Sequence, residues 1–313
     1  MPIRINIYKM DALSTVLEAT GLRSVVYSKF PLAAPWGLDI VKDENSQFWR
    51  LVSGSCTVGS PDGCIIEMKE GDLVFVPHGS AHWIADKATS LRMSSPEFVK
   101  ARREGIQVFS SEGDVTTLIA GHFEFDYQFL HPFLKDLPSI IHIKQYVTEN
   151  QLLLKQVTQL MLEELNNEKP GSRIMLKCLS EIMFVNIIRT YLEQAVPDNG
   201  FLSALNDTRI SKALKLIQDS PQNDWTLESL ASEIGMSRSV FFNRFKKIVH
   251  ETPVSYLTNW RIRQAQKLLM MDNSNVSEIA LSVGYQSESA FNRIFKSKTG
   301  QTPAVYRRSK IIK

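Results

Sequence analysis

A short pattern that occurs twice in the last hundred residues restricts the fold of this chain more than any other feature. Residues 230–237 return as residues 279–286, and each copy leads into a basic segment that contains phenylalanine. Each copy finishes with Thr-Pro-x-x-Tyr, at Tyr256 and at Tyr306. An apolar helix, a glycine turn, a serine and a basic amphipathic helix are typical of a helix-turn-helix, whose second helix fits the DNA major groove. Two copies predict a reader of two adjacent grooves.

The first copy carries helix start and stop signals at suitable positions. Thr226 can cap a helix that ends at Gly235, because glycine tolerates the positive φ of a helix end. Ser237 can cap the next helix. The apolar residues of that helix recur every three or four positions, so we expect them to face a core. They are Val240, Phe241, Phe245 and Ile248.

The second copy repeats these signals. Ser277 is expected to cap its first helix, Gly284 to end it, and Gln286 or Ser287 to open the recognition helix. Residues 255–271 contain no helix breaker, so one long helix should join the copies. Such a spacer could hold the two recognition helices about 34 Å apart, which is one turn of DNA.

The charge distribution agrees with this interpretation. Residues 207–313 contain 17 Lys and Arg against 9 Asp and Glu, whereas the remainder holds 19 against 24. A basic domain joined to an acidic one favours neutralisation of phosphates by one half only. The alternative is a helical bundle with duplicated packing and no ligand, which the duplicated cap, turn and basic helix disfavour.

Over about 100 C-terminal residues the sequence resembles the AraC/XylS family of transcription regulators. The resemblance rests on residues of both copies and of the segment that joins them. They include Ala231, Gly235, Phe245-Lys246-Lys247, Thr252-Pro253, Arg261, Ala280, Gly284-Tyr285, Phe295-Lys296, Gly300, Thr302-Pro303 and Tyr306. One departure is His250, where the first unit of many members has glycine.

The resemblance also implies which side chains contact DNA. Base-reading positions fall on Arg238, Ser239, Phe242 and Asn243 in the first recognition helix, and on Glu288, Ser289, Asn292 and Arg293 in the second. Arginine, asparagine and glutamate can each select a base through its major-groove edge. Contacts to phosphate are expected from Thr226, Lys246, Arg261 and Lys296, and Arg261 could instead brace the two units.

The N-terminal half is rich in β-branched and aromatic runs separated by turns. Strands are expected near residues 23–27, 48–52, 56–58, 64–68, 72–76 and 116–120, with a hairpin turn at 60–63. Residues 71–82 resemble the second motif of cupins, which implies a small barrel of the jelly-roll type. Together with Ala34-Pro35-Trp36-Gly37, they resemble the cupin branch that is attached to AraC-type regulators.

Many cupins are metalloenzymes, and this alternative can be tested on the sequence. No histidine precedes His78, and Gln47 stands where the first cupin motif would place glutamate. A single histidine does not make a metal site with three or four ligands. Two histidines at the spacing of His78 and His82 on a loop more often belong to a structural turn than to a metal site. We therefore expect no metal, no cofactor and no catalytic residue.

Aromatic residues of the N-terminal half suggest a pocket for a small-molecule effector, because such pockets combine aromatic walls with a few polar groups. The candidate lining is Trp36, Phe48, Trp49, Phe75, His82 and Trp83. The alternative is that these rings fill the barrel or a domain contact. Three cysteines without paired spacing indicate a reducing cytoplasm, and a redox switch between Cys56 and Cys64 is a further hypothesis.

Residues 146–166 and 173–195 carry apolar stripes at helical spacing and predict a helical hairpin. The resemblance implies that such helices form a homodimer, against the alternative of purely internal packing. The predicted fold is α+β, with a cupin-like sensor barrel (1–140), the hairpin (141–196), a linker (197–206) and a double helix-turn-helix domain (207–313). The sequence shows neither a signal peptide nor a membrane span.

These observations predict a cytoplasmic, sequence-specific transcription regulator rather than an enzyme. The resemblance implies an activator that works with double-stranded DNA and RNA polymerase. Our mechanistic hypothesis is that an effector in the barrel changes the packing of residues 146–206. Two other classes stay open. A DNA-binding scaffold without an effector would regulate fully on its own, and a cupin enzyme would hold stoichiometric iron or manganese.

Overall fold

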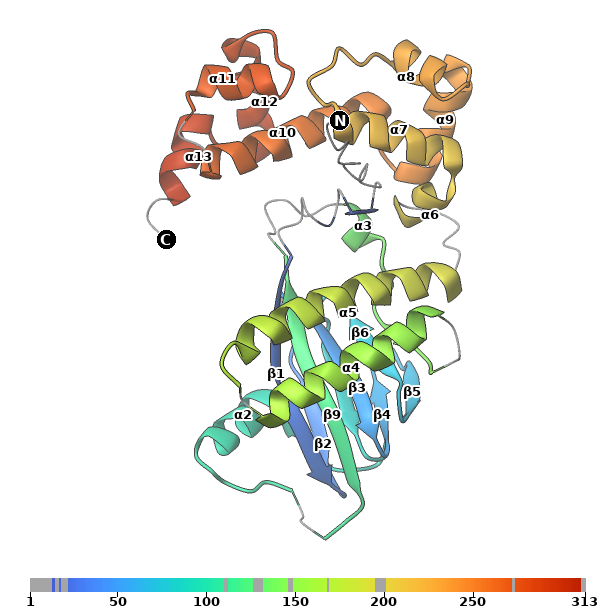
Figure 1. Ribbon diagram of the computed structural model, residues 1–313, viewed down its shortest axis with the longest axis vertical. Helices are drawn as coiled ribbons and strands as arrows, with labels where there is room; N and C mark the ends of the chain where they lie inside the picture. The colour runs from blue at the N-terminus through green and yellow to red at the C-terminus, as the bar shows by residue number, and fades with distance from the viewer. Residues whose placement is uncertain are drawn as a thin grey trace, which may run out of the picture. The chain divides into compact units, whose positions relative to one another are not determined.

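The computed structural model describes residues 13, 14, 17, 22–109, 112–125, 132–145, 149–167, 169–194, 201–271 and 274–310. The chain divides into two compact units. One consists of Leu22–Leu130 and Leu134–Val196, and the other is built on Pro197–Lys313, with which His131–Phe133 group. Figure 1 shows that the first unit combines sheets and helices, whereas the second is helical.

The first unit contains two five-stranded sheets. One sheet runs β1 (Arg23–Ala33), β9 (Val115–Glu124), β3 (Ser46–Ser53), β6 (Leu73–Val76) and β10 (Ile141–Ile143). The other runs β5 (Ile65–Lys69), β4 (Ser55–Gly59), β7 (His82–Ala85), β2 (Gly37–Ile40) and β8 (Met93–Ser94). In the described residues the sheets do not close into the predicted barrel but form an open sandwich.

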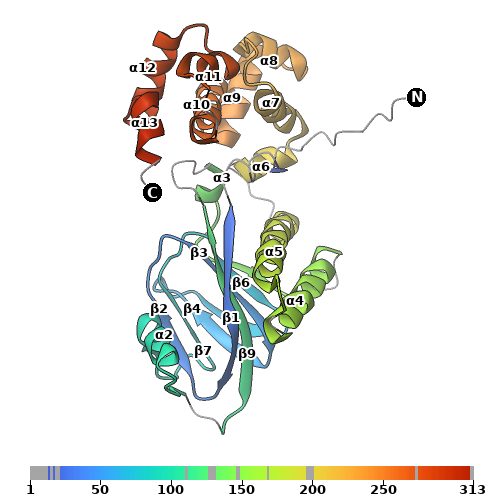
Figure 2. The same ribbon diagram turned by 60° about the vertical axis from the view of Figure 1, so that its left-hand side comes forward.

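Helices cover the sandwich. Two long helices, α4 (Glu149–Asn167) and α5 (Ser172–Gln194), form the expected hairpin and pack on the outer face of the β1-containing sheet (Figure 1). A shorter helix, α2 (Ser95–Arg103), lies beside β2 on the side of the sandwich away from the hairpin (Figure 2). The helix α3 spans Pro132–Lys135. Neither α2 nor α3 was expected from the sequence.

All six predicted strand segments are confirmed, but β2, β7, β8 and β10 were not anticipated. The predicted hairpin turn connects β4 and β5, where the N–H of Gly63 donates to the carbonyl of Ser60 at 3.0 Å. Gly63 has a φ of +89°, which glycine adopts readily. The hairpin turn could therefore be predicted from its local residues, whereas short strands that depend on distant partners could not.

The second unit consists of helices. They are α6 (Phe201–Asn206), α7 (Thr208–Asp219), α8 (Leu227–Glu233), α9 (Arg238–Val249), α10 (Pro253–Met271), α11 (Val276–Ser282), α12 (Glu288–Thr299) and α13 (Pro303–Lys310). The long joining helix is confirmed as α10. The helices α8 and α9 form the first helix-turn-helix, and α11 and α12 form the second.

Three details differ from the sequence predictions. Asn275 rather than Ser277 caps α11, because its side chain accepts from the N–H of Glu278 at 2.7 Å in a capping box. Part of the segment predicted as a linker forms α6, whose first residue Phe201 is fully buried, while residues 197–200 lie outside the described residues. Val240, expected in the core, is 53% exposed.

Candidate nucleic-acid interface and ligand cavity

The first turns of α9 and α12 present matching positions on their outer faces. In α9, Arg238, Ser239 and Asn243 are exposed and Phe242 is half-buried. The corresponding positions of α12 hold Glu288, Ser289 and Arg293, which are exposed, and Asn292, which is half-buried. Base contacts in helix-turn-helix proteins come from the N-terminal residues of the recognition helix. All eight residues lie in the N-terminal halves of these two helices, and their contacts to bases stay a prediction.

Buried aromatic residues fix the opposite faces of these helices. Phe241 and Phe245 of α9 are fully buried, and the ring centroids of Phe245 and Tyr256 lie 5.9 Å apart. In the second helix-turn-helix the ring centroids of Phe295 and Tyr306 lie 5.5 Å apart in a similar edge-to-face contact. The repeated Thr-Pro-x-x-Tyr pattern thus supplies one buried tyrosine to each core.

The predicted phosphate contacts fall into two groups. Lys246 and Lys296 are exposed near the C-terminal ends of α9 and α12 and can reach solvent. Thr226 is the cap of α8, and its side-chain oxygen accepts from the N–H of Ser229 at 3.0 Å. Arg244 of α9 pairs with Asp207 at 2.6 Å. This ion pair joins α9 to the residue that caps α7.

Arg261 braces the two helix-turn-helix units against each other. From α10 its guanidinium donates to the carbonyls of Pro221 and Asn223 at 2.7 and 2.8 Å, in the loop before α8. The same group lies 5.7 Å from the ring centroid of Tyr285, which belongs to the turn of the second unit. Burial lowers the pKa of Arg261 and raises that of Tyr285. Of the two roles expected for Arg261, the geometry supports the bracing one.

Gly284 allows this close junction. Its φ is +92°, and a Cβ placed there would lie 2.8 Å from both Arg261 Nη2 and the Cα of Gln222. The adjacent Gln286 donates to Asp224 at 3.3 Å across the same junction. By contrast, a Cβ at the equivalent Gly235 of the first unit would meet no atom within 4 Å. The second turn is therefore shaped by its neighbour as well as by its own backbone.

His250 ends α9 in the left-handed conformation, with a φ of 59°. The equivalent residue of the second helix-turn-helix is Gly300, with a φ of 76°. The departure from the family pattern therefore changes the residue but not the helix end, and it places a side chain in a strained backbone region.

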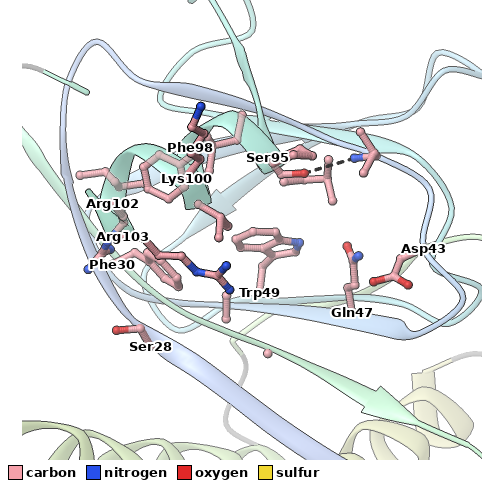
Figure 3. A pocket seen from close by; sticks show the side chains of 18 of the residues that line it. Ser28, Phe30, Asp43, Gln47, Trp49, Ser95, Phe98, Lys100, Arg102 and Arg103 are labelled. Carbon is pink, nitrogen blue, oxygen red and sulfur yellow. Dashed lines mark hydrogen bonds between the residues drawn. The ribbon is translucent and has the colours of Figure 1, made fainter. Parts of the chain in front are cut away.

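In the first unit of the chain, a cavity of about 880 Å³ lies between the sandwich and α2. Side chains from β1, β2, β3, β9 and α2 form its wall. The apolar part consists mainly of Phe30, Leu32, Leu38, Ile40, Trp49 and Phe98. Figure 3 shows Trp49, Phe98 and Gln47 directed into this space. Its size and mainly apolar wall are typical of small-molecule sites.

The strand β3 connects this cavity to the helical hairpin by alternating its side chains. Gln47 and Trp49 line the cavity, whereas Phe48 and Arg50 point to the opposite face. Phe48 packs on Phe123, whose ring lies 4.9 Å from that of Phe184 in α5. Arg50 donates to Thr158 Oγ1 of α4 at 3.1 Å and also to the carbonyl of Gly71.

Of the six aromatic residues predicted to line an effector pocket, Trp49 alone lines this cavity. Phe48 and Phe75 lie on the face that packs against Phe184 of α5. Trp36 is buried in the sandwich core, and Trp83 lies under the guanidinium of Arg92, 4.8 Å from its ring. His82 does not line the cavity but bonds to Trp49, which does. The sequence could not indicate which of these residues line this cavity, because the parity of a strand cannot be read when both of its faces are buried.

His82 holds Trp49 in place. The indole N–H of Trp49 donates to His82 Nε2 at 2.9 Å, so Nδ1 must carry the imidazole proton, and it donates to the carbonyl of Ser80 at 2.8 Å. Burial lowers the pKa of His82, which favours this neutral form. The second histidine of the pair, His78, is exposed and bonds to the carbonyl of Leu137. The pair thus serves two separate structural contacts.

Other chemistry has little support in the part of the chain that the structure describes. It contains no group of three or more His, Cys, Asp or Glu that could hold a metal ion. In the β4–β5 ladder Cys56 lies opposite Met68, and Met68 is four residues along the chain from Cys64. Cys56 and Cys64 are therefore too far apart for a disulfide. Burial raises the pKa of Cys56 to about 12, so its thiol stays protonated. None of the described helices is both long and apolar enough to span a bilayer.

Comparisons with known proteins give a consistent result. A cupin family model matches residues 11–193, and a helix-turn-helix domain model matches residues 230–309. The HTH-type transcriptional regulator AlkR of Acinetobacter baylyi is 30% identical, over 95% of this chain and 99% of its own. A putative AraC-like transcription regulator of Streptomyces antibioticus is 29% identical, over 96% and 99%. The DNA-binding domain of AdpA, solved with a target DNA, is 29% identical over 32% of this chain and 89% of that domain, with a TM-score of 0.31.

Proposed function

The chain belongs to the AraC family of helix-turn-helix transcription regulators, and on this premise we propose how its two units produce regulated DNA binding. It is a sequence-specific DNA-binding regulator of transcription with a cupin-type N-terminal domain. The finer proposals concern the contacts to bases and phosphates, the oligomeric state and the effector. The observation that carries the DNA contacts is the matched exposure of the predicted base-reading positions on α9 and α12.

We propose that α9 and α12 enter two successive major grooves on one face of the duplex. The 19-residue helix α10 between them is about 28 Å long at 1.5 Å per residue, a length suited to this spacing. The eight residues named above read bases, and Lys246 and Lys296 contact phosphates. Arg238 would exchange its 2.8 Å ion pair with Glu228 for a contact to DNA. This exchange costs little, because both side chains are exposed.

The junction around Arg261 sets the relative orientation of the two recognition helices. Arg261, Tyr285 and Gln286 connect the second helix-turn-helix to the loop that precedes the first. A fixed orientation selects one spacing between the two halves of the DNA site, since both helices must fit their grooves together. Arg261 is therefore proposed to act by positioning the two units, and Thr226 by capping α8, instead of by contacts to phosphate.

The helical hairpin is proposed to form the homodimer contact. Five large apolar side chains of α4 and α5 are exposed by more than two-fifths, although both helices also pack on the sandwich. They are Leu152, Leu160, Ile174, Met175 and Ile182. Exposed apolar residues clustered on one helical element are typical of protein–protein contacts. Cross-linking of the full-length protein, with Ile174→Glu as the variant, would test this contact.

We propose that the cavity binds a small-molecule effector. The alternation along β3 gives such a ligand a short route to the hairpin, because Trp49 touches the ligand while its neighbours Phe48 and Arg50 touch α5 and α4. Displacement of Trp49 must shift these neighbours, since packed interiors deform little. The ligand would thereby change how the DNA-binding unit is presented. The protein is further proposed to act in the cytoplasm as an activator in contact with RNA polymerase, and not as an enzyme.

Selection of bound sequences from a random DNA pool with the full-length protein tests the DNA-binding proposal. The expected result is a motif with two half-elements about one helical turn apart. Repeating the selection with Arg293→Ala should relax one half-element and leave the other unchanged. A motif with only one half-element, or equal relaxation of both halves, would contradict the two-groove model.

A further inference from the structure

The polar group that the cavity offers to a ligand is the side-chain amide of Gln47. Its residue is only 7% exposed, and its Oε1 atom is buried without a hydrogen-bond partner among the described residues. Figure 3 shows this amide at the end of the cavity near Asp43, directed into the space beside Trp49. A buried acceptor without a partner destabilises the protein, so such atoms in native structures have an explanation. A ligand that donates a hydrogen bond would provide one.

The charges around the cavity restrict the ligand further. The wall includes four cationic residues, Lys42, Lys100, Arg102 and Arg103, against the two anionic residues Asp43 and Glu104. All four cations are exposed, so they lie at the solvent side of the site. The guanidinium of Arg102 lies 4.9 Å from the ring centroid of Phe30, which places a positive charge over the apolar wall. This field attracts anions and disfavours cations.

We propose that the cavity binds a mainly apolar molecule, neutral or anionic, that donates an O–H or N–H hydrogen bond to Gln47 Oε1. This inference rests on the proposed role of the cavity as the effector site, and it adds the chemical class of the effector. Trp49 and Phe98 supply the aromatic contacts, and α2 covers the bound molecule. The donor meets the amide at the end near Asp43, and an anionic group, where present, faces the cations of α2.

A pair of matched probes tests the hydrogen bond. The first is 2-naphthol, and the second is 2-methoxynaphthalene, which has the same rings but no donor. Calorimetric titration of the full-length protein without DNA should show about tenfold tighter binding of 2-naphthol, the ratio expected from one buried hydrogen bond. Equal affinities for the two probes, or no binding of either, would overturn the inference.

Variants separate the role of Gln47 from a general effect on folding. Gln47→Leu should bring the affinity ratio close to one and should bind 2-methoxynaphthalene at least as tightly as the wild type does. Its thermal midpoint should not fall, because the change removes a buried polar atom that has no partner. Gln159→Leu, an exposed change on α4, is the control and should keep the tenfold ratio. A ratio that stays near ten in Gln47→Leu would assign the selectivity to another group.

Charge is tested with two further probes. We expect 6-hydroxy-2-naphthoate to bind at least as tightly as 2-naphthol, and the cation 2-naphthylmethylammonium to bind more weakly. Tighter binding of the cation would refute the charge assignment. The outcome is independent of effector control, because these titrations contain no DNA. Operator affinity is then measured with and without 2-naphthol. If 2-naphthol keeps its tenfold preference but does not change operator affinity, the ligand class holds and effector control is refuted. If the two probes bind equally but operator affinity changes, only the ligand class is refuted.

Discussion

Replacing Gly284 by alanine tests whether direct packing holds the two helix-turn-helix units together, with Gly235→Ala as the internal control. Both glycines end equivalent helices with positive φ, at +92° and +65°. Alanine in the left-handed region costs about 1–2 kcal/mol, and the reduced freedom of the unfolded chain offsets about 0.4–1 kcal/mol of this. Gly235→Ala adds no contact and should therefore destabilise by about 1 kcal/mol.

Gly284→Ala should cost more, because its Cβ would lie 2.8 Å from Gln222 Cα and from Arg261 Nη2. Overpacking of this kind adds about 1–3 kcal/mol, so the total should reach about 2–4 kcal/mol. The less favourable φ at Gly284 contributes to the difference as well. A double-mutant cycle with Arg261→Ala separates the two causes, since removal of the arginine relieves part of the overlap and leaves the backbone angle unchanged.

Hydrogen exchange of the full-length protein in increasing denaturant is the suitable assay. A chain of two units does not unfold in one transition, whereas peptides from α8 to α12 report their own free energies of opening. The same proteins are then titrated with the selected DNA site and with sites whose half-elements are one base pair closer or farther apart. Equal destabilisation by the two alanines, together with an unchanged spacing preference, would refute the role assigned to the junction.

Three further predictions concern single side chains. Arg293→Ala should weaken binding to the preferred site by about 1–3 kcal/mol and leave non-specific binding nearly unchanged, as measured by titration of specific and scrambled duplexes. His250→Gly should stabilise the first helix-turn-helix by about 0.5 kcal/mol, because glycine removes the left-handed strain but has more freedom when unfolded, and exchange of peptides from α9 checks this. Burial lowers the pKa of His82 below the pKa that it has in the unfolded chain. The contribution of the neutral imidazole to stability is therefore fully present above about pH 6.5 and is lost as the pH falls through the folded pKa. The thermal midpoint of His82→Gln should therefore depend less on pH below about 6.5 than that of the wild type.

The C-terminal unit was largely predictable because its signals are local and occur twice. Gly235, Gly284 and the tyrosines of the two Thr-Pro-x-x-Tyr patterns lie where the sequence placed them. The errors there concern single positions. Asparagine and serine are both favoured at helix caps, and the capping box between Asn275 and Glu278 decides against Ser277. The bracing contacts of Arg261 could not be derived, because they join residues about 40 positions apart.

The N-terminal unit was predictable in class but not in detail. Predicted strands appeared where β-branched runs occur, whereas α2 was missed because it begins with Ser95-Pro96 in a segment that resembles a loop. Without α2 there was no indication that Phe98 closes a cavity. The sequence shows that Gln47 stands where a metal-binding glutamate would be. It does not show that Gln47 is a buried polar residue of the cavity wall, because this depends on which face of β3 carries the side chain.

The parity of β3 shows why that face was hidden and why it matters. Residues 46–51 are all buried, so the strand lacks the apolar and polar alternation that would reveal its inner face. A strand buried on both sides must have packed groups on both sides, here the cavity wall and the helices α4 and α5. The burial of both faces, which hides the cavity residues from sequence reasoning, thus also places the cavity and the hairpin on opposite faces of a single strand. Trp49 in the cavity wall and Arg50 in contact with α4 are consecutive residues, so under the proposed mechanism a ligand that displaces Trp49 acts on the hairpin through a single peptide bond.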